Sequence, residues 1–281
     1  MKKLTRHLGC VALRKKLAAQ IVARLNILLI MGGVLAAHSR LADLGSAFRS
    51  ALTGEYVREM HSAKRIFLSN SFIPAVIYYL GFGIDGKSKT KFPATISWTI
   101  RGGLPKYVHF VLWSYAWSKF FRVLVRVAKV TGDSFIKKFA AQMYATGVAV
   151  TMISSVGKSE FHDKIHFVGA FLYMIDHHIL FQYLNTAWFY RAVFYASLIM
   201  MGRQIGKVKA MGIPPMLLEQ SNWKEIRKSF GASIAKRVYR REALIMLFEN
   251  AMFIAFVSGI TSRLPSEEEA NRKLRKRAEK H

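Results

Sequence analysis

Histidine and acidic side chains gather in one apolar stretch, residues 161–178. His162, His166, Tyr173 and His177 are separated by four, seven and four residues, which places them on one broad face of a helix. Two histidines four residues apart beside carboxylates suit zinc, and histidines on separate membrane helices can ligate haem. The same residues would also form the polar rim of a membrane span, or bind a lipid headgroup or a substrate. We expect the structural role, with no metal and no cofactor, and haem is the alternative.

A second set of polar residues lies inside apolar blocks. Glu249 and Asn250 fall in the middle of the last block. A carboxylate in lipid is costly, so it needs a polar partner or a polar cavity. His166, Asp176 and Arg191 are candidate partners, and we expect His166, Asp176 and Glu249 to be buried polar residues. Glu249 then serves either as a structural contact or as part of a proton or substrate path.

Catalytic motifs are missing from the sequence. It contains no phosphate-binding loop, no dinucleotide fingerprint and no nucleophile elbow. Cys10 is the single cysteine, so the chain forms neither an intrachain disulfide nor a cysteine-based metal cluster. We therefore expect a protein that is not an enzyme.

Six apolar blocks must position these residues. Each has roughly the length needed to cross the hydrocarbon core of a bilayer, and 52% of the chain is hydrophobic. The blocks are 66–84, 107–125, 139–156, 165–184, 187–202 and 243–262. They predict an all-α, multi-pass transmembrane helical bundle of six spans, in which Asn185 and Thr186 form the turn of a helical hairpin.

Three regions follow from this pattern. Residues 1–65 are a basic N-terminal extension whose apolar helix, at 17–38, either spans the membrane or lies in its interface. Residues 66–263 form the transmembrane bundle, and residues 264–281 are a charged C-terminal tail. Up to Gly54 the only acidic residue is Asp43. That composition is typical of a mitochondrial targeting segment, and a signal anchor fits nearly as well.

The formal net charge of +27 restricts the partners. The basic residues cluster between the apolar blocks and do not form a separate basic domain, so we expect no nucleic acid and favour anionic phospholipids such as cardiolipin. The candidate headgroup ligands are Arg203, Lys207, Lys209, Arg227, Lys228, Arg237 and Arg240.

The segment Asn222–Arg241 reads as one amphipathic helix. Its apolar residues recur every three or four positions: Trp223, Ile226, Phe230, Ile234 and Val238. Such a helix either lies on the membrane surface, where its bases meet headgroups or an acidic partner subunit, or packs on the protein's own loops.

Three short segments resemble the Frag/DRAM/Sfk family of six-span membrane proteins. They are the loop Phe92–Ser97, the Gly103-Leu104-Pro105 sequence and the stretch Phe161–Gly169. The resemblance covers about Ile66 to Ser262. It implies that His162 with His166 match the histidines that open the family's fourth span, and that Glu249 matches the acidic residue of its sixth. It also implies lipid or GPI-anchor remodelling in the secretory or endolysosomal system.

Three functions are consistent with the sequence. The first is a non-catalytic accessory subunit of a large mitochondrial inner-membrane assembly, such as a respiratory complex or ATP synthase, with other membrane subunits as partners. The second is the remodelling role that the resemblance implies, in the ER, Golgi or endolysosomal membrane. The third is a transporter or redox carrier that uses Asp176, Glu249 and the histidines.

Overall fold

The computed structural model describes residues 38–83, 91–148, 160–213, 218 and 223–279. The chain divides into two units, residues 1–43 and 44–281. The apolar block predicted at 17–38 lies, apart from its last residue, outside the described residues.

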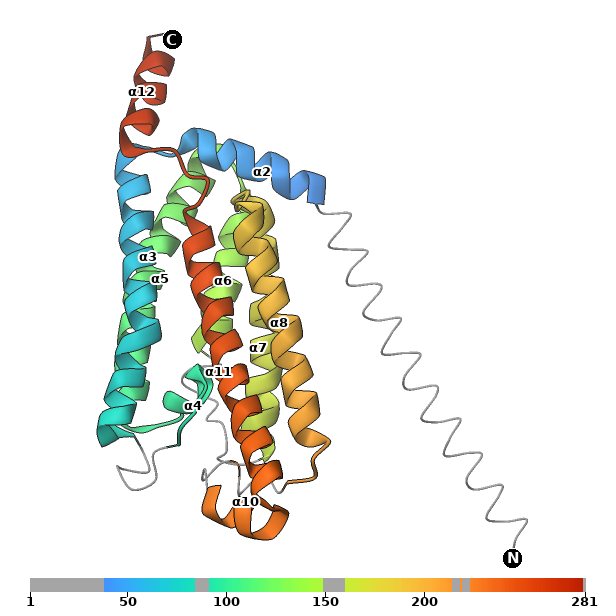
Figure 1. Ribbon diagram of the computed structural model, residues 1–281. Coiled ribbons are helices and arrows are strands. Elements are labelled where there is room, and N and C mark those ends of the chain that lie inside the picture. The colour runs from blue at the N-terminus through green and yellow to red at the C-terminus, as the bar shows by residue number, and fades with distance from the viewer. Residues whose placement is uncertain (1–37, 84–90, 149–159, 214–217, 219–222, 280–281) are drawn as a thin grey trace, which may run out of the picture. The chain divides into compact units, whose positions relative to one another are not determined.

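The described residues form helices and contain no strand, which confirms the all-α class. The chain order is α2 (His38–Ala51), α3 (Gly54–Ile77), a π-helical turn η1 (Tyr78–Phe82), α4 (Ile96–Thr99), α5 (Gly103–Thr131), α6 (Ser134–Val148), α7 (Glu160–Tyr183), α8 (Trp188–Lys209), α10 (Trp223–Phe230), α11 (Ala232–Ile260) and α12 (Glu267–Ala278) (Figure 1).

Each predicted apolar block overlaps a long helix: α3 with η1, α5, α6, α7, α8 or α11. Among the described residues, α11 is the one helix that is long and apolar enough to cross a membrane by length and composition. Charges shorten the apolar part of the others. Lys119 and Arg122 interrupt α5, for example, and Lys64 and Arg65 precede the apolar half of α3.

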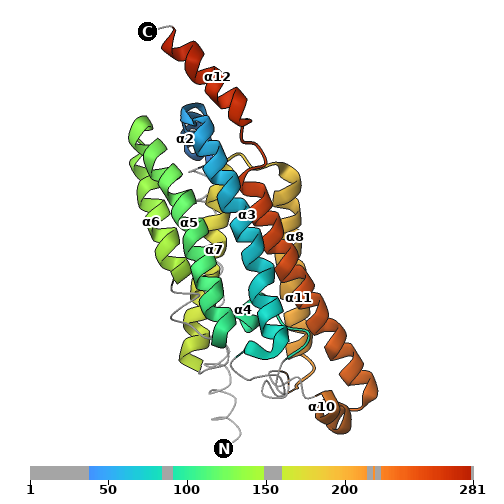
Figure 2. The same ribbon diagram turned by 90° about the vertical axis from the view of Figure 1, so that its left-hand side faces the viewer.

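Helices α3 and α5 pack side by side along most of their length (Figures 1 and 2). Pro74 lies inside α3 and has no N–H, so the carbonyl of Asn70, four residues earlier, loses its helical donor. The buried imidazole of His109 on α5 makes a hydrogen bond to the Asn70 backbone. The neighbouring helix thus supplies a donor in place of the one that the proline removes.

Helices α7, α8 and α11 meet through aromatic rings. The Phe181 ring lies edge-on to that of Phe194, with centroids 5.2 Å apart, and Phe256 contacts His177. The α7–α8 turn lies at the predicted Asn185 and Thr186, and Thr186 Oγ1 donates to the Gly259 carbonyl of α11 at 3.2 Å. A Cβ at Gly259 would lie 2.8 Å from the Thr186 methyl, so only glycine permits this approach.

The prediction of one helix over Asn222–Arg241 is wrong. The chain breaks at Gly231, whose φ of 84° is left-handed, so α10 ends at Phe230. The next helix then runs without interruption from Ala232 into the last apolar block. Helix α8 likewise continues to Lys209, beyond the block that was expected to end at 202.

The apolar stripe of this region packs on the protein itself. Ile226 of α10 and Val238 of α11 are fully buried, Ile213 is largely buried, and the partly buried Trp223 packs against them. The stripe therefore packs on the protein's own residues, as the second of the two interpretations expects, while the basic side chains stay exposed, as the first one requires.

The expected boundary at 65/66 falls inside a helix, whereas the one at 263/264 falls in the loop between α11 and α12. Helix α3 begins at Gly54 and runs through the first boundary. The tail helix α12 packs on α3, where Asn271 Oδ1 accepts from the Gly54 N–H at 2.9 Å.

Within α12, a hydrogen bond from Lys273 lowers the pKa of the exposed Glu269 carboxyl.

Candidate functional site

Glu249 joins α11 to the loop that precedes α5. Its carboxylate accepts hydrogen bonds from the backbone N–H of Ile96, and from the N–H and Oγ of Ser97 at 3.4 and 3.0 Å. These groups form the N-terminus of the short helix α4, where a negative charge is favoured. The hydrogen bonds of Glu249 therefore run to this loop and not to His166, Asp176 or Arg191, the neighbours suggested by the sequence.

The same loop is fixed by a buried aromatic and ionic cluster. Tyr78 Oη accepts from the Lys91 N–H at 2.8 Å and from Trp98 Nε1 at 3.1 Å. The Lys91 ammonium pairs with Glu242 of α11 at 2.9 Å and lies over the Trp98 ring, with Arg101 also over that ring. Two glutamates of α11 thus hold residues 91–101 in one conformation, in which the Phe92–Pro93 peptide is cis.

Asp176 and the two following histidines make polar contacts with other residues of the helical bundle. Gln142 of α6 donates to Asp176 Oδ2 at 3.2 Å. His177 Nδ1 contacts the Tyr173 carbonyl one turn earlier, and His178 Nδ1 contacts the hydroxyl of Tyr195 on α8. These contacts connect α7 with α6 and α8.

The predicted face of histidines is not assembled into a metal site by the described residues. His166 and His177 are both buried, whereas the side chains of His162 and Asp163 lie outside the described part of the chain. No group of three or more His, Cys, Asp or Glu side chains suited to a metal ion occurs among the described residues.

Arg191 caps the preceding helix. Its guanidinium donates to the carbonyls of Thr186 and Phe181, at 2.7 and 2.9 Å, and to the side chain of Gln182 at 2.9 Å. The Phe181 carbonyl, in the last turn of α7, also accepts from the Thr186 N–H, and the Thr186 carbonyl lies in the turn, so the guanidinium joins the end of α7 to the turn. The hydrogen bonds of Arg191 therefore stabilise the turn between α7 and α8.

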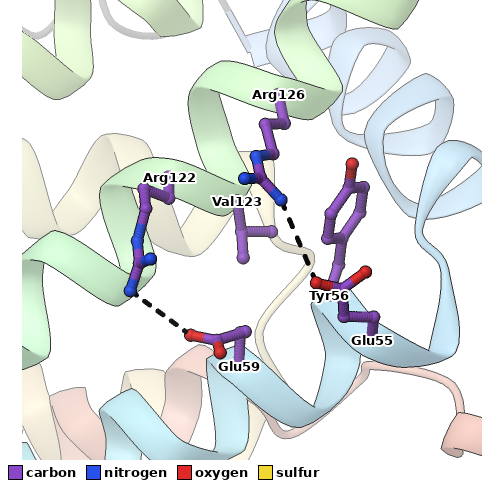
Figure 3. Close-up of a pocket in the computed structure, with 6 residues that line it drawn as sticks. All are labelled: Glu55, Tyr56, Glu59, Arg122, Val123 and Arg126. Atoms are coloured by element: carbon purple, nitrogen blue, oxygen red, sulfur yellow. Dashed lines mark ion pairs between the residues drawn. The ribbon is translucent and has the colours of Figure 1, made fainter.

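A small, partly open hollow of about 80 Å³ lies between α3 and α5 (Figure 3). It is lined by opposite charges: Arg122 faces Glu59 at 3.9 Å, and Arg126 faces Glu55 at 4.0 Å. Ligand pockets in proteins usually enclose about 300 Å³ or more. The hollow is therefore better suited to holding two helices together than to binding a substrate.

The predicted headgroup residues gather at one end of the second unit. The C-terminal part of α8, all of α10 and the first turns of α11 meet there (lower part of Figure 1). All seven side chains are exposed: Arg203, Lys207, Lys209, Arg227, Lys228, Arg237 and Arg240. We call these seven residues the basic end.

Several contacts could not be found by sequence reasoning. The Lys91–Glu242 pair joins residues 151 positions apart, and the Lys119–Glu59 pair joins residues 60 apart. Only the His109 contact had a usable signal, since a proline inside an apolar helix leaves a carbonyl that needs a donor from elsewhere.

The polar side chains described above thus connect helices and loops of the protein to one another.

Comparisons of the chain with protein families, with characterised proteins and with solved structures find no match.

Proposed function

We propose that this chain is a non-catalytic, multi-pass integral membrane protein, and that it serves as an accessory subunit of a large assembly in the mitochondrial inner membrane. Six helices would cross the bilayer: α3 with η1, α5, α6, α7, α8 and α11.

One observation carries the membrane part of this proposal. Large apolar side chains point outward from five of these helices: Val76, Val111, Val168, Ile199 and Leu247 are each more than half exposed. Polar side chains are meanwhile buried between the helices, including Asn70, His109, Asp176, His177 and Gln204. Water-soluble proteins seldom expose so many large apolar groups, whereas lipid favours this distribution.

Helix length supports the count of spans. Helices α3, α5, α7, α8 and α11 contain 22 to 29 residues. At about 1.5 Å per residue such helices are about 33 to 44 Å long, and the hydrocarbon core is about 30 Å thick. The described part of α6 is shorter, at 15 residues, and the block predicted for it continues into residues 149–156, outside the described part.

The accessory role is supported by how the polar residues are used. Glu249, Asp176 and Arg191 are each hydrogen-bonded to a neighbouring loop, helix or turn. The acid-poor, basic N-terminal segment favours a mitochondrial address.

Alkaline extraction and native electrophoresis together test this proposal. The tagged chain should stay in the membrane pellet at high pH, fractionate with mitochondria, and migrate in mild detergent with a complex far larger than 31.9 kDa. Release at high pH would contradict the membrane part. Migration as a free small species would contradict the accessory role.

Lipid or GPI-anchor remodelling remains the second candidate, and one contact favours it. The loop at 92–97, one of the segments that carry the resemblance, touches Glu249, a match that the resemblance implies, through Ile96 and Ser97. Localisation of the tagged chain to the ER, Golgi or endolysosomes, and not to mitochondria, would favour this candidate.

A further inference from the structure

Helices α8, α10 and α11 all contribute side chains to the basic end. Helices α8 and α11 pack closely, so the last turns of one lie beside the first turns of the other. Arg241 Nη1 donates to the buried Gln204 side chain at 2.7 Å, which ties the two helices at this level. The basic side chains of α8 and those of α11 therefore lie at the same level of the protein and contribute to one surface.

The basic side chains of α10 and α11 are directed outward by packing on the opposite side of these helices. Ile226 and Val238 are fully buried in the small apolar cluster beneath them. Because this cluster holds α10 against α11, Arg227, Lys228 and Arg237 stand on the exposed side. The seven bases form no ion pair or hydrogen bond within the described part of the chain.

The nearby acids of α11 do not neutralise this surface. Glu242 is directed inward to the buried Lys91, and Glu249 to the loop at Ile96 and Ser97. Glu225 is the one described acid on α10, and α8 carries none, so the seven bases keep a net positive charge that suits an anionic partner.

Exposed aromatic and apolar residues border the bases. Trp223 Nε1 donates to the Phe92 carbonyl at 3.2 Å, and the Phe92 and Trp223 rings both lie beside that of Tyr239. The η1 turn reaches this group through Tyr79, whose ring centroid lies 5.7 Å from that of Phe92, and Leu80 and Phe82 of the same turn are exposed. Aromatic residues of this kind concentrate where hydrocarbon meets headgroups.

We infer that the basic end binds the phosphates of anionic phospholipids in the headgroup layer, with the aromatic residues at the boundary of the hydrocarbon. This inference rests on the proposed membrane function. An acidic protein would match the charge alone, whereas a bilayer that contains anionic lipid matches both the charge and the adjoining apolar surface.

A matched pair of variants tests the inference. The first carries Arg227→Gln, Lys228→Gln, Arg237→Gln and Arg240→Gln. The control removes four exposed bases elsewhere, through Lys129→Gln, Arg272→Gln, Arg275→Gln and Lys276→Gln. The full chain, purified in detergent, is titrated with mixed micelles that contain cardiolipin or phosphatidylcholine, and with polyglutamate and inorganic polyphosphate.

The wild type should bind cardiolipin micelles at least tenfold more tightly than phosphatidylcholine micelles. The first variant should lose about tenfold in cardiolipin affinity and the control less than twofold. Equal losses in both variants would overturn the inference, because they would indicate an effect of net charge alone. Binding of polyglutamate or polyphosphate in preference to cardiolipin would also overturn it, in favour of an acidic protein or a free anion.

The extraction experiment separates this inference from the proposed function. A chain that is released from membranes at alkaline pH contradicts both. A chain that stays in the pellet, while the first variant binds cardiolipin as the wild type does, contradicts only the assignment of the basic end.

Discussion

At one end of the second unit, carboxylates on the surface face bases on the neighbouring helix. Glu59 pairs with Lys119 at 3.1 Å, Glu55 lies 4.0 Å from Arg126, and Arg58 lies 3.5 Å from Glu267 of α12. Further along α11 from the basic end, Glu242 and Glu249 are instead directed inward to the loop at 91–97. The paired acids hold helices together, whereas the inward acids fix a loop and leave the bases outside available to a partner.

This difference separates charge that stabilises the fold from charge that serves recognition. A base with an acidic neighbour contributes to helix packing, and its loss should lower stability. A base without such a neighbour should be replaceable at little cost to the fold, while binding suffers. Mutations at the two ends should therefore affect different measurements.

The largest effect is expected at the inward acid Glu249. Glu249→Leu removes the acceptor for the N–H groups of Ile96 and Ser97 and for the Ser97 hydroxyl. Hydrogen bonds to a charged group contribute about 1.5 to 3 kcal/mol each, so we expect the unfolding free energy to fall by about 3 kcal/mol. Unfolding in detergent measures the fall, and hydrogen exchange at the two amides should accelerate.

Glu249→Gln is the matched control, since it keeps an acceptor oxygen and should lose about 1 kcal/mol. If Glu249→Leu unfolds at the same denaturant concentration as the wild type, other contacts hold the loop, and the inward direction of this acid has no structural importance.

A smaller effect is expected at His109. His109→Leu removes the donor to the Asn70 backbone and should cost about 1 to 2 kcal/mol. In a Pro74→Ala background, residue 74 regains its N–H and can donate to Asn70 itself. The same His109→Leu change should then cost clearly less. An equal cost in both backgrounds would show that His109 acts through its packing and not by compensating the proline.

At the paired end, Glu59→Lys should cost about 1 kcal/mol, because it places like charges beside Lys119 and Arg122. The double variant Glu59→Lys, Lys119→Glu should recover most of that loss in a double-mutant cycle. The matching change at the basic end, Arg237→Glu, should alter the unfolding free energy by less than about 0.5 kcal/mol. The comparison between the ends fails if Arg237→Glu destabilises as much as Glu59→Lys.

The helical class and the approximate helix positions were predictable from the sequence, because an apolar block of about 20 residues is typical of a helix and too long for a strand. The α7–α8 hairpin was predictable for a local reason, since Asn185 and Thr186 are the only polar residues between two apolar runs and Asn tolerates the positive φ of 50° that it adopts.

The boundaries of α8 and α11 were not predictable. Helix α11 contains a basic first third and an apolar remainder, and the change in polarity falls inside one continuous helix. The polarity of the side chains indicates what surrounds each part of a helix, but it does not indicate where the helix begins or ends. The break at Gly231 depends on a left-handed backbone that a glycine permits but does not require.

The partner of Glu249 lay beyond sequence reasoning for a different reason. The need for a polar partner followed from the cost of a carboxylate in an apolar block. One partner is Ser97, which lies 152 positions earlier in the chain. No local sequence pattern predicts that its loop packs against α11.

The central claim is that the outward apolar residues lie in lipid while the basic end lies at the headgroups. It can be measured with spin labels in a Cys10→Ser background, attached one at a time at Val76, Val111, Ile199, Leu247 and Arg240, with the protein in cardiolipin-containing vesicles. Oxygen, which concentrates in hydrocarbon, should relax the first four labels strongly, whereas a water-soluble nickel complex should relax the label at Arg240. If the nickel complex relaxes all five labels alike, the apolar faces are in water and the account is wrong.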